Sequence, residues 1–254
     1  MISYGWCRGI EDAERMRLLG FDFIECTVVS LNVEDPAACR RALPAYLESP
    51  LPVSVFSIFF PGDLKLVGPE RDAERVRRYV HGTAEALHRI GARTVVLGSG
   101  RSRSLPEGWE PARGEEQLLS TLDAIADEFQ GAGLTLAVEP LNRKESNIVN
   151  SVDEAVALAK QINRGPVRVL ADFYHMDEEG EALETLERNR DWLAHVHLAD
   201  TGRLSPGTGT YPYEEFAARL KAAGYGGTIS AECTVREPER ELEAGLAFMK
   251  RNFG

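Results

Sequence analysis

Short runs of β-branched and aromatic residues alternate along the chain with longer stretches in which apolar residues recur at helical spacing. The eight short runs, each predicted to be a strand, are residues 2–6, 21–28, 53–60, 94–98, 134–141, 167–173, 193–200 and 227–234. The eight predicted helices are residues 10–19, 36–47, 69–90, 114–131, 152–162, 178–189, 213–223 and 237–251. Strand and helix therefore alternate throughout the sequence.

Glycines mark the ends of several predicted helices. Gly20, Gly91 and Gly224 each follow the last apolar position of a helix and directly precede the next strand, where a positive φ ends the helix. Eight βα units without a Pro/Ser-rich linker predict a single (β/α)₈ TIM barrel of the α/β class over residues 1–254. An open doubly wound sheet is the alternative, but it usually has fewer strands, and no G-x-G-x-x-G motif follows the first strand.

Composition narrows the choice of partner and compartment. Lys plus Arg number 29 against 40 Asp plus Glu, and the resulting formal charge of −11 disfavours nucleic acid as a partner. A hydrophobic share of 43% is enough for a large core, which excludes a disordered or fibrous protein. The four cysteines are scattered, which predicts reduced thiols. Because no long apolar run or signal-peptide pattern occurs, we expect a cytoplasmic protein without a membrane partner.

Each of the last four predicted strands ends near a side chain that can bind a metal ion. These residues are Glu139, Asp172, His197 and Glu232. In a barrel the carboxyl ends of the strands converge, so we expect the four side chains to surround one point. Three carboxylates and one imidazole suit one divalent ion, Mn²⁺ first, with Mg²⁺, Co²⁺ or Zn²⁺ as alternatives. A single carboxylate at a strand end is often a helix cap, but clustered buried carboxylates favour a cation because their burial without one is costly.

The sequence resembles the xylose isomerase-like TIM barrels, a family of sugar isomerases and epimerases. The resemblance covers essentially the whole chain and is clearest in the segments EPLNRKE (139–145), ADFYHM (171–176), HVHLADTGR (195–203) and SAEC (230–233). It implies that the four residues named above hold one metal ion, and that Glu139 and Glu232 also act as acid and base. It implies substrate contacts for His175, Arg203 and Glu145. Barrels of this family often form dimers or tetramers, so the resemblance also implies a homo-oligomer.

The chemistry of the residues agrees with this resemblance. Moving a carbonyl along a sugar, or inverting the carbon beside it, removes a proton from a weakly acidic carbon. A divalent ion stabilises the resulting enediolate, and a positioned base adds roughly 10² to 10⁴-fold in rate. We therefore predict a metal-dependent isomerase or epimerase of a small sugar, keto acid or related polyhydroxy carbonyl compound. Arg203 and His175 would hold the charge that develops on substrate oxygens.

Three other functions are compatible with parts of the pattern. A dehydratase of a keto-inositol or sugar acid would use the same site, since the same enolate can expel a β-hydroxyl. An abasic-site endonuclease would need further histidines on earlier strands, and residues 1–80 contain none. A non-catalytic sugar-binding barrel would bind metal and ligand without turnover.

Several polar and aromatic residues near strand ends give weaker signals. His195 lies two positions before His197, so we expect it on the same side of the strand, one layer deeper, as a hydrogen-bonded interior residue. Four residues near strand ends could form a wall that faces the sugar or could belong to the core: Trp6, Glu25, Phe59 and Phe60. We expect Arg101 and Arg103 either to bind a carboxylate or phosphate of the substrate or to lie in a solvated loop. Residues 61–69 are predicted to form a long loop that could act as a lid.

Overall fold

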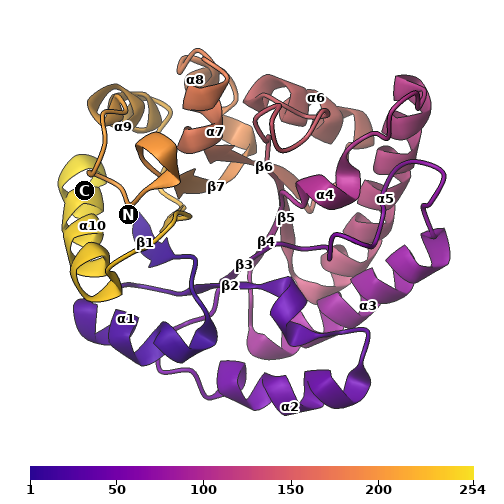
Figure 1. Ribbon diagram of the computed structural model, residues 1–254, viewed down its shortest axis with the longest axis horizontal. Helices are drawn as coiled ribbons and strands as arrows, with labels where there is room; N and C mark the ends of the chain where they lie inside the picture. Colours follow the sequence, from indigo (N-terminus) through magenta and orange to yellow (C-terminus); the bar gives the residue numbers. More distant parts are fainter.

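The computed structural model describes residues 1–254 and contains eight parallel strands in one sheet, which curls into a ring with the helices outside it (Figure 1). This confirms the predicted (β/α)₈ barrel. The strands are β1 (Ser3–Trp6), β2 (Glu25–Thr27), β3 (Val55–Ser57), β4 (Thr94–Leu97), β5 (Thr135–Val138), β6 (Val167–Asp172), β7 (Leu193–Leu198) and β8 (Thr228–Ala231).

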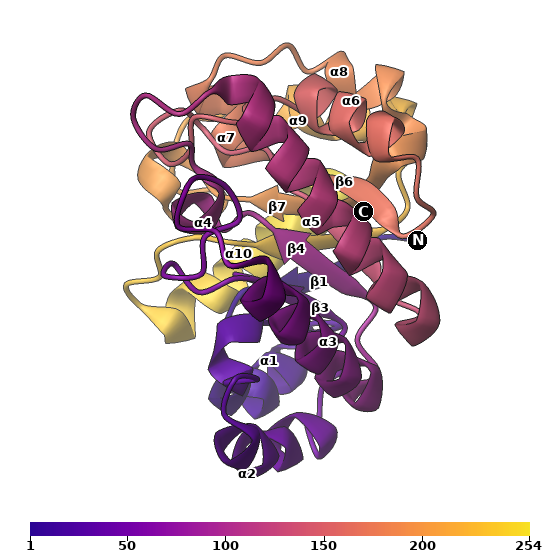
Figure 2. The same cartoon turned by 90° about the vertical axis from the view of Figure 1, so that its right-hand side faces the viewer.

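Helices cover the ring on all sides, and the view turned by 90° shows α3 and α5 lying along its outer surface (Figure 2). The helices are α1 (Ala13–Leu19), α2 (Pro36–Leu47), α3 (Ala73–Ile90), α4 (Gly100–Arg103), α5 (Pro111–Ala132), α6 (Val152–Ile162), α7 (Phe173–Glu178), α8 (Thr185–Arg188), α9 (Tyr213–Ala222) and α10 (Pro238–Phe253).

Local capping explains where the longer helices begin and end. The carboxylate of Asp72 accepts a hydrogen bond from the backbone N–H of Arg75, so α3 begins at Ala73 rather than at residue 69. Gly20 and Gly91 adopt φ of 86° and 85° and end α1 and α3, as the sequence predicts.

The ring of strands is nearly closed. Adjacent strands pair in register from β2 through β8 and on to β1, whereas β1 and β2 share a single bridge between Cys7 and Glu25. The backbone N–H of Arg8 adds a hydrogen bond of 2.9 Å to the carbonyl of Glu25. The thinnest pairing of the barrel therefore lies beside Glu25.

Two apolar cores lie on the two sides of the strands. The larger core fills the space between strands and helices, while a small one packs inside the ring and consists of Phe23, Val55, Val96, Ala137 and Leu170. Because side chains alternate along a strand, residues two positions further on also point inward, one layer nearer the carboxyl ends. Ala137 and Leu170 are thus followed by Glu139 and Asp172, which the alternation places at the carboxyl end of the barrel.

The predicted helix over residues 178–189 is wrong. The carboxylate of Asp172 accepts a hydrogen bond of 2.8 Å from the backbone N–H of Tyr174, so α7 begins directly after β6. Gly180, at φ 62°, lies just beyond α7, and only the short α8 follows. Asp172 is therefore both the last residue of a strand and the cap of a helix.

All eight predicted strands are longer than the observed ones, and the excess is largest for residues 21–28, 53–60, 134–141 and 227–234. The apolar residues that flank the observed strands are buried by side-chain packing and do not pair with the sheet. Phe59, for example, stacks on Phe129 of α5 with 5.7 Å between ring centroids.

The structure contains no helix with both the length and the apolar character required to cross a membrane. All four cysteines are free thiols.

Candidate active site

Four side chains from consecutive strands meet at the carboxyl end of the barrel. Asp172 ends β6, His197 lies on β7, and Glu139 and Glu232 directly follow β5 and β8. One ligand atom from each of the four lies within 4.8 Å of the others. The site predicted from the sequence is therefore a cluster in space, with only Glu232 partly exposed.

The imidazole of His197 faces this cluster through one nitrogen. Its Nδ1 lies 3.2 Å from Oε1 of Glu139, and 3.9 Å from both Oδ2 of Asp172 and Oε2 of Glu232. Its Nε2, on the opposite side of the imidazole ring, lies 2.9 Å from Oε1 of Glu25. A proton on Nε2 would be donated to Glu25, which leaves the Nδ1 lone pair directed at the carboxylates.

Glu25, which the sequence suggested for a sugar-facing wall or the core, instead contacts two histidines beside the cluster, a role that the sequence did not predict. Its side chain is fully buried, and its second oxygen lies 3.0 Å from Nε2 of His195, whose Nδ1 contacts Oγ1 of Thr228 at 2.7 Å. Burial would raise the pKa of Glu25, but the two histidines hold it well below its usual range, so Glu25 stays ionised. His195 is a buried, hydrogen-bonded interior residue, as predicted.

The negative charge of the acidic cluster is only partly compensated by Arg203 and His197. Burial, together with the charge of Glu232, raises the pKa of Glu139 to about 7, and burial also raises the pKa of Asp172. Burial alone would lower the pKa of His197, but Glu25 and other neighbours raise it well above its usual value. A cation bound at Nδ1 would take the place of the ring proton and stabilise the ionised carboxylates. Three carboxylate oxygens and one imidazole nitrogen are ligands that fit such an ion.

A second set of potential ligands consists of Cys7, Glu25 and His197, whose ligand atoms also lie within 4.8 Å of one another. This set shares His197 with the first. It therefore belongs to the same site rather than forming another.

Gly98, directly after β4, makes room for Glu139. A Cβ at this position would lie 2.1 Å from Oε2 of Glu139, closer than any non-bonded contact allows. The absence of a side chain at Gly98 is thus what lets the Glu139 carboxylate reach the cluster.

Arg103 lies neither in solvent nor against the substrate, so both predictions for it are wrong. Its side chain is fully buried and donates hydrogen bonds to the carbonyl oxygens of Leu97, at 3.3 Å, and of Glu139, at 2.6 Å. Burial lowers its pKa to about 10. Arg103 therefore joins the end of β4 to the residue that follows β5.

The three predicted substrate contacts surround the same cluster. Arg203 donates to Oε1 of Glu145 at 2.7 Å and to Oε2 of Glu232 at 2.5 Å. His175 is buried, and its Nδ1 accepts hydrogen bonds from the backbone and side-chain nitrogens of Asn142 at 3.1 and 2.9 Å. The ring proton of neutral His175 is therefore on Nε2, a buried donor without a partner in the protein.

A hollow of about 470 Å³ opens at this end of the barrel. Glu139, Glu145, Arg203 and Glu232 line one part of it, and the loops after β3 and β4 line the rest, with Phe60 in its wall. Of the other residues considered for such a wall, Trp6 and Phe59 belong to the core, and Glu25 lies behind His197.

Residues 61–69 form a packed loop. Leu64, Leu66 and Val67 are buried in it, and the N–H of Leu66 donates to the carbonyl of Ser102 at 2.8 Å.

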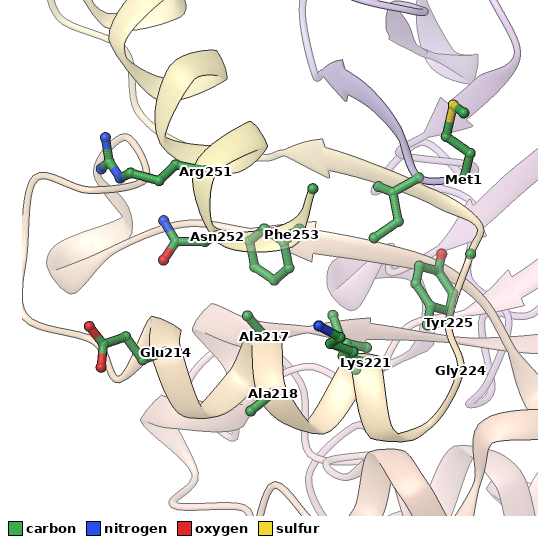
Figure 3. Close-up of a pocket in the computed structure, with 14 residues that line it drawn as sticks. Met1, Glu214, Ala217, Ala218, Lys221, Gly224, Tyr225, Arg251, Asn252 and Phe253 are labelled. Atoms are coloured by element: carbon green, nitrogen blue, oxygen red, sulfur yellow. The ribbon is translucent and has the colours of Figure 1, made fainter.

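A second hollow, of about 600 Å³, lies between α9 and α10 at the opposite end of the strands (Figure 3). Met1, Lys221, Tyr225 and Arg251 are among its lining residues, and Glu214 is the one carboxylate side chain. It has no cluster of acid, base or metal-binding groups, and barrels of this type carry their chemistry at the other end.

Several proteins that are similar to this chain are sugar epimerases. Residues 13–252 match a family model described as xylose isomerase-like TIM barrel. The 3-dehydro-D-guloside 4-epimerase of Escherichia coli (strain K12) is 27% identical over 252 residues, which cover 95% of this chain and 94% of that protein. The D-psicose 3-epimerase of Agrobacterium fabrum is 29% identical over 232 residues, covering 88% of this chain and 78% of that protein. A crystal structure of D-psicose 3-epimerase with D-tagatose, from Clostridium cellulolyticum H10, shares the fold with a TM-score of 0.86 at 18% identity and covers 99% of both chains.

Proposed function

The chain belongs to the xylose isomerase-like TIM barrel family, and from this premise we propose that it is a divalent-metal-dependent isomerase or epimerase of a small sugar or related polyhydroxy carbonyl compound. The observation that carries the proposal is the cluster in which Glu139, Asp172, His197 and Glu232 bring their ligand atoms within 4.8 Å of one another. The sugar epimerases among the relatives support the same reaction class.

The four clustered residues would hold the metal ion. Their mixture of three carboxylates and one imidazole favours Mn²⁺, with Mg²⁺, Co²⁺ and Zn²⁺ as alternatives. When bound, the ion would polarise the substrate carbonyl and a neighbouring hydroxyl, which makes the adjacent C–H more acidic.

Glu139 and Glu232 would move the proton. Each carboxylate is part of the cluster, so a carbon held between them is within reach of both. Burial raises the pKa of Glu139 to about 7 in the metal-free protein, and a bound cation would lower it, so Glu139 would be ionised and able to accept a proton at neutral pH. In one direction Glu139 would remove the proton from carbon, and Glu232, having taken a proton from water, would then deliver it to the enediolate; exchange of both carboxylates with water restores the starting state. Delivery to the opposite face of the same carbon gives epimerisation. Delivery to the neighbouring carbon, together with transfer of a proton between the two oxygens, gives isomerisation.

The surrounding polar groups would orient the substrate. The Nε2–H of His175 has no partner in the protein and would donate to a substrate oxygen on which charge develops. Arg203 holds Glu232 at 2.5 Å and Glu145 at 2.7 Å, so it fixes the position of one proton-transferring group. Glu145 is partly exposed in the hollow and would accept a hydrogen bond from a substrate hydroxyl.

The direct test is exchange of substrate hydrogen with solvent. The Mn²⁺-loaded protein is incubated in D₂O with C3 to C6 ketoses, hydroxypyruvate and inososes, and incorporation of deuterium beside the carbonyl is followed by NMR. We expect at least one substrate to gain a single deuterium, and Glu139→Gln and Glu232→Gln each to remove the exchange. The control is Glu128→Gln, because Glu128 is a carboxylate on α5 that contacts His81 at 3.0 Å and does not line the hollow.

Other outcomes would point to other reactions. Turnover with full retention of the substrate hydrogen would indicate a hydride shift, and loss of one water by mass would indicate a dehydratase. Ligand binding without any turnover would indicate a sugar-binding barrel. Full retention contradicts proton transfer, loss of water contradicts the isomerase or epimerase assignment, and binding without turnover contradicts both.

We also propose a cytoplasmic location and self-association of the chain. The four free thiols support a reducing compartment. Self-association rests on the resemblance to oligomeric barrels, and the molar mass in solution tests it: a value at the 28.0 kDa of one chain would contradict it.

A further inference from the structure

We propose that the substrate carries an anionic group, a carboxylate or a phosphate ester, at the end remote from its reacting carbonyl, and that Arg101 binds this group, with the positive charge of Lys65 adding to the attraction. The inference rests on the proposed function, because that function determines which end of the substrate reacts. It assigns a binding role to the part of the hollow that the metal cluster and its neighbours do not use.

Arg101 is a cation of the hollow without an anionic partner. It lines the hollow on the side formed by the loops after β3 and β4, and no carboxylate oxygen lies within 4.0 Å of its guanidinium. Arg203, the other arginine of the hollow, is paired with Glu145 and Glu232. An arginine that lines a hollow and has no carboxylate partner in the protein is available to a ligand anion.

The surrounding residues hold Arg101 in place. Its side chain lies against Gly62, where a Cβ would be 3.2 Å from Nε and 3.4 Å from Cζ of Arg101. The Nζ of Lys65 donates to the carbonyl oxygens of Gly62 and Arg101, each at 2.8 Å, which joins the two loops. The nearby Asp63 is itself paired with Arg75 at 2.8 Å, so it does not neutralise Arg101. Lys65 adds a second positive charge beside Arg101 and has no ion-pair partner within 4.0 Å.

The hollow is lined by three glutamates, Glu139, Glu145 and Glu232, and by two arginines, of which only Arg101 lacks a carboxylate partner. Glu139 and Glu232 belong to the acidic cluster that would hold the metal ion, whereas Arg101 lies in α4, after β4. A substrate anion would be attracted to Arg101, which is free to pair with it, and the carbonyl end would then lie toward the acidic cluster.

Binding of inert analogues tests this without requiring turnover. The affinities of D-glucitol, D-glucitol 6-phosphate and D-gluconate for the Mn²⁺-loaded protein are measured by isothermal titration calorimetry, with wild type, Arg101→Gln and Lys65→Gln. The control is Arg113→Gln, because Arg113 is an exposed arginine of α5 that lies over the Trp109 ring. Charge-assisted hydrogen bonds predict that one anionic analogue binds about 10- to 100-fold more tightly than glucitol.

We expect Arg101→Gln to remove most of this advantage and Lys65→Gln to remove part of it, with glucitol affinity unchanged and Arg113→Gln equal to wild type. Whether the phosphate or the carboxylate gains identifies the source of the anion. Equal affinity of all three analogues, or an advantage that persists in Arg101→Gln, would overturn the proposal.

The deuterium exchange described above separates this inference from the proposed function. Exchange of neutral ketoses with no anionic preference would refute the anion site and leave the function standing. An Arg101-dependent anionic preference without exchange of any ketose would refute the function and leave the anion site standing.

Discussion

Replacement of Glu25 by glutamine is expected to weaken metal binding although Glu25 is not a metal ligand. Glu25 uses its two oxygens to accept from His197 and His195, at 2.9 and 3.0 Å. A glutamine has nearly the same shape, but it has one accepting oxygen and one donating amide. One of the two histidines would then face a donor, and the negative charge that fixes the His197 ring would be lost.

The size of the effect follows from these contacts. Loss of the group that orients a metal-binding histidine typically costs 10- to 100-fold in metal affinity, or about 1.4 to 2.7 kcal/mol. The unmatched histidine donor is fully buried, so the free energy of unfolding should also fall, by about 1 to 3 kcal/mol.

The assay is titration of the metal-free protein with Mn²⁺, with free Mn²⁺ followed by electron paramagnetic resonance, and a urea unfolding curve for each variant. Glu128→Gln is the matched control, because it removes the charge of an exposed carboxylate that contacts His81. An Mn²⁺ dissociation constant for Glu25→Gln within about twofold of wild type would refute the reasoning, since typical losses are about tenfold or more.

Four further predictions concern neighbouring groups. Gly98→Ala places a Cβ 2.1 Å from Oε2 of Glu139 and should lower Mn²⁺ affinity about tenfold or more, measured by the same titration; Gly131→Ala, whose Cβ meets nothing within 4 Å, is its control, and equal affinity of the two variants would contradict it. Because burial raises the pKa of Glu139 to about 7, Mn²⁺ should bind more tightly as pH rises from about 6 to 8, and a flat profile would be evidence against this. The same raised pKa of Glu139 predicts that the metal-free protein loses stability as pH rises from about 4.5 to about 7. The stability that protonated Glu139 contributes is fully present below its unfolded pKa near 4.5 and is lost as pH rises through its folded pKa. A melting temperature that increases between these two pH values would argue the opposite. Asn142→Ala removes the side-chain donor to Nδ1 of His175 and should raise KM about 3- to 10-fold with little change in kcat, and steady-state kinetics showing an unchanged KM would count against it.

The parts of the site that the sequence predicted are those that alternation along a strand controls. Glu139 and Asp172 lie two positions beyond the inward-facing Ala137 and Leu170, so a correct strand assignment also places the ligands. The barrel then brings strands β5 to β8 side by side, which gathers residues from four separate segments at one end.

The parts that the sequence did not predict depend on contacts without a local signal. Glu25 lies 172 residues from His197 in sequence and meets it only because the ring of strands nearly closes. Arg103 looks like an ordinary loop arginine in its sequence context, and only the fold shows that it is buried beneath the carbonyls of Leu97 and Glu139. The missed boundary at Asp172 has a similar cause, because a single carboxylate acts at once as strand end and helix cap.

Anomalous X-ray diffraction from crystals of the protein grown with Mn²⁺ tests the central claim most directly. We expect one Mn²⁺ per chain, bound by Glu139, Asp172 and Glu232 and by Nδ1 of His197, with the remaining coordination positions of the ion open to water or substrate. Anomalous density elsewhere in the chain, or none at this cluster at saturating Mn²⁺, would contradict the claim.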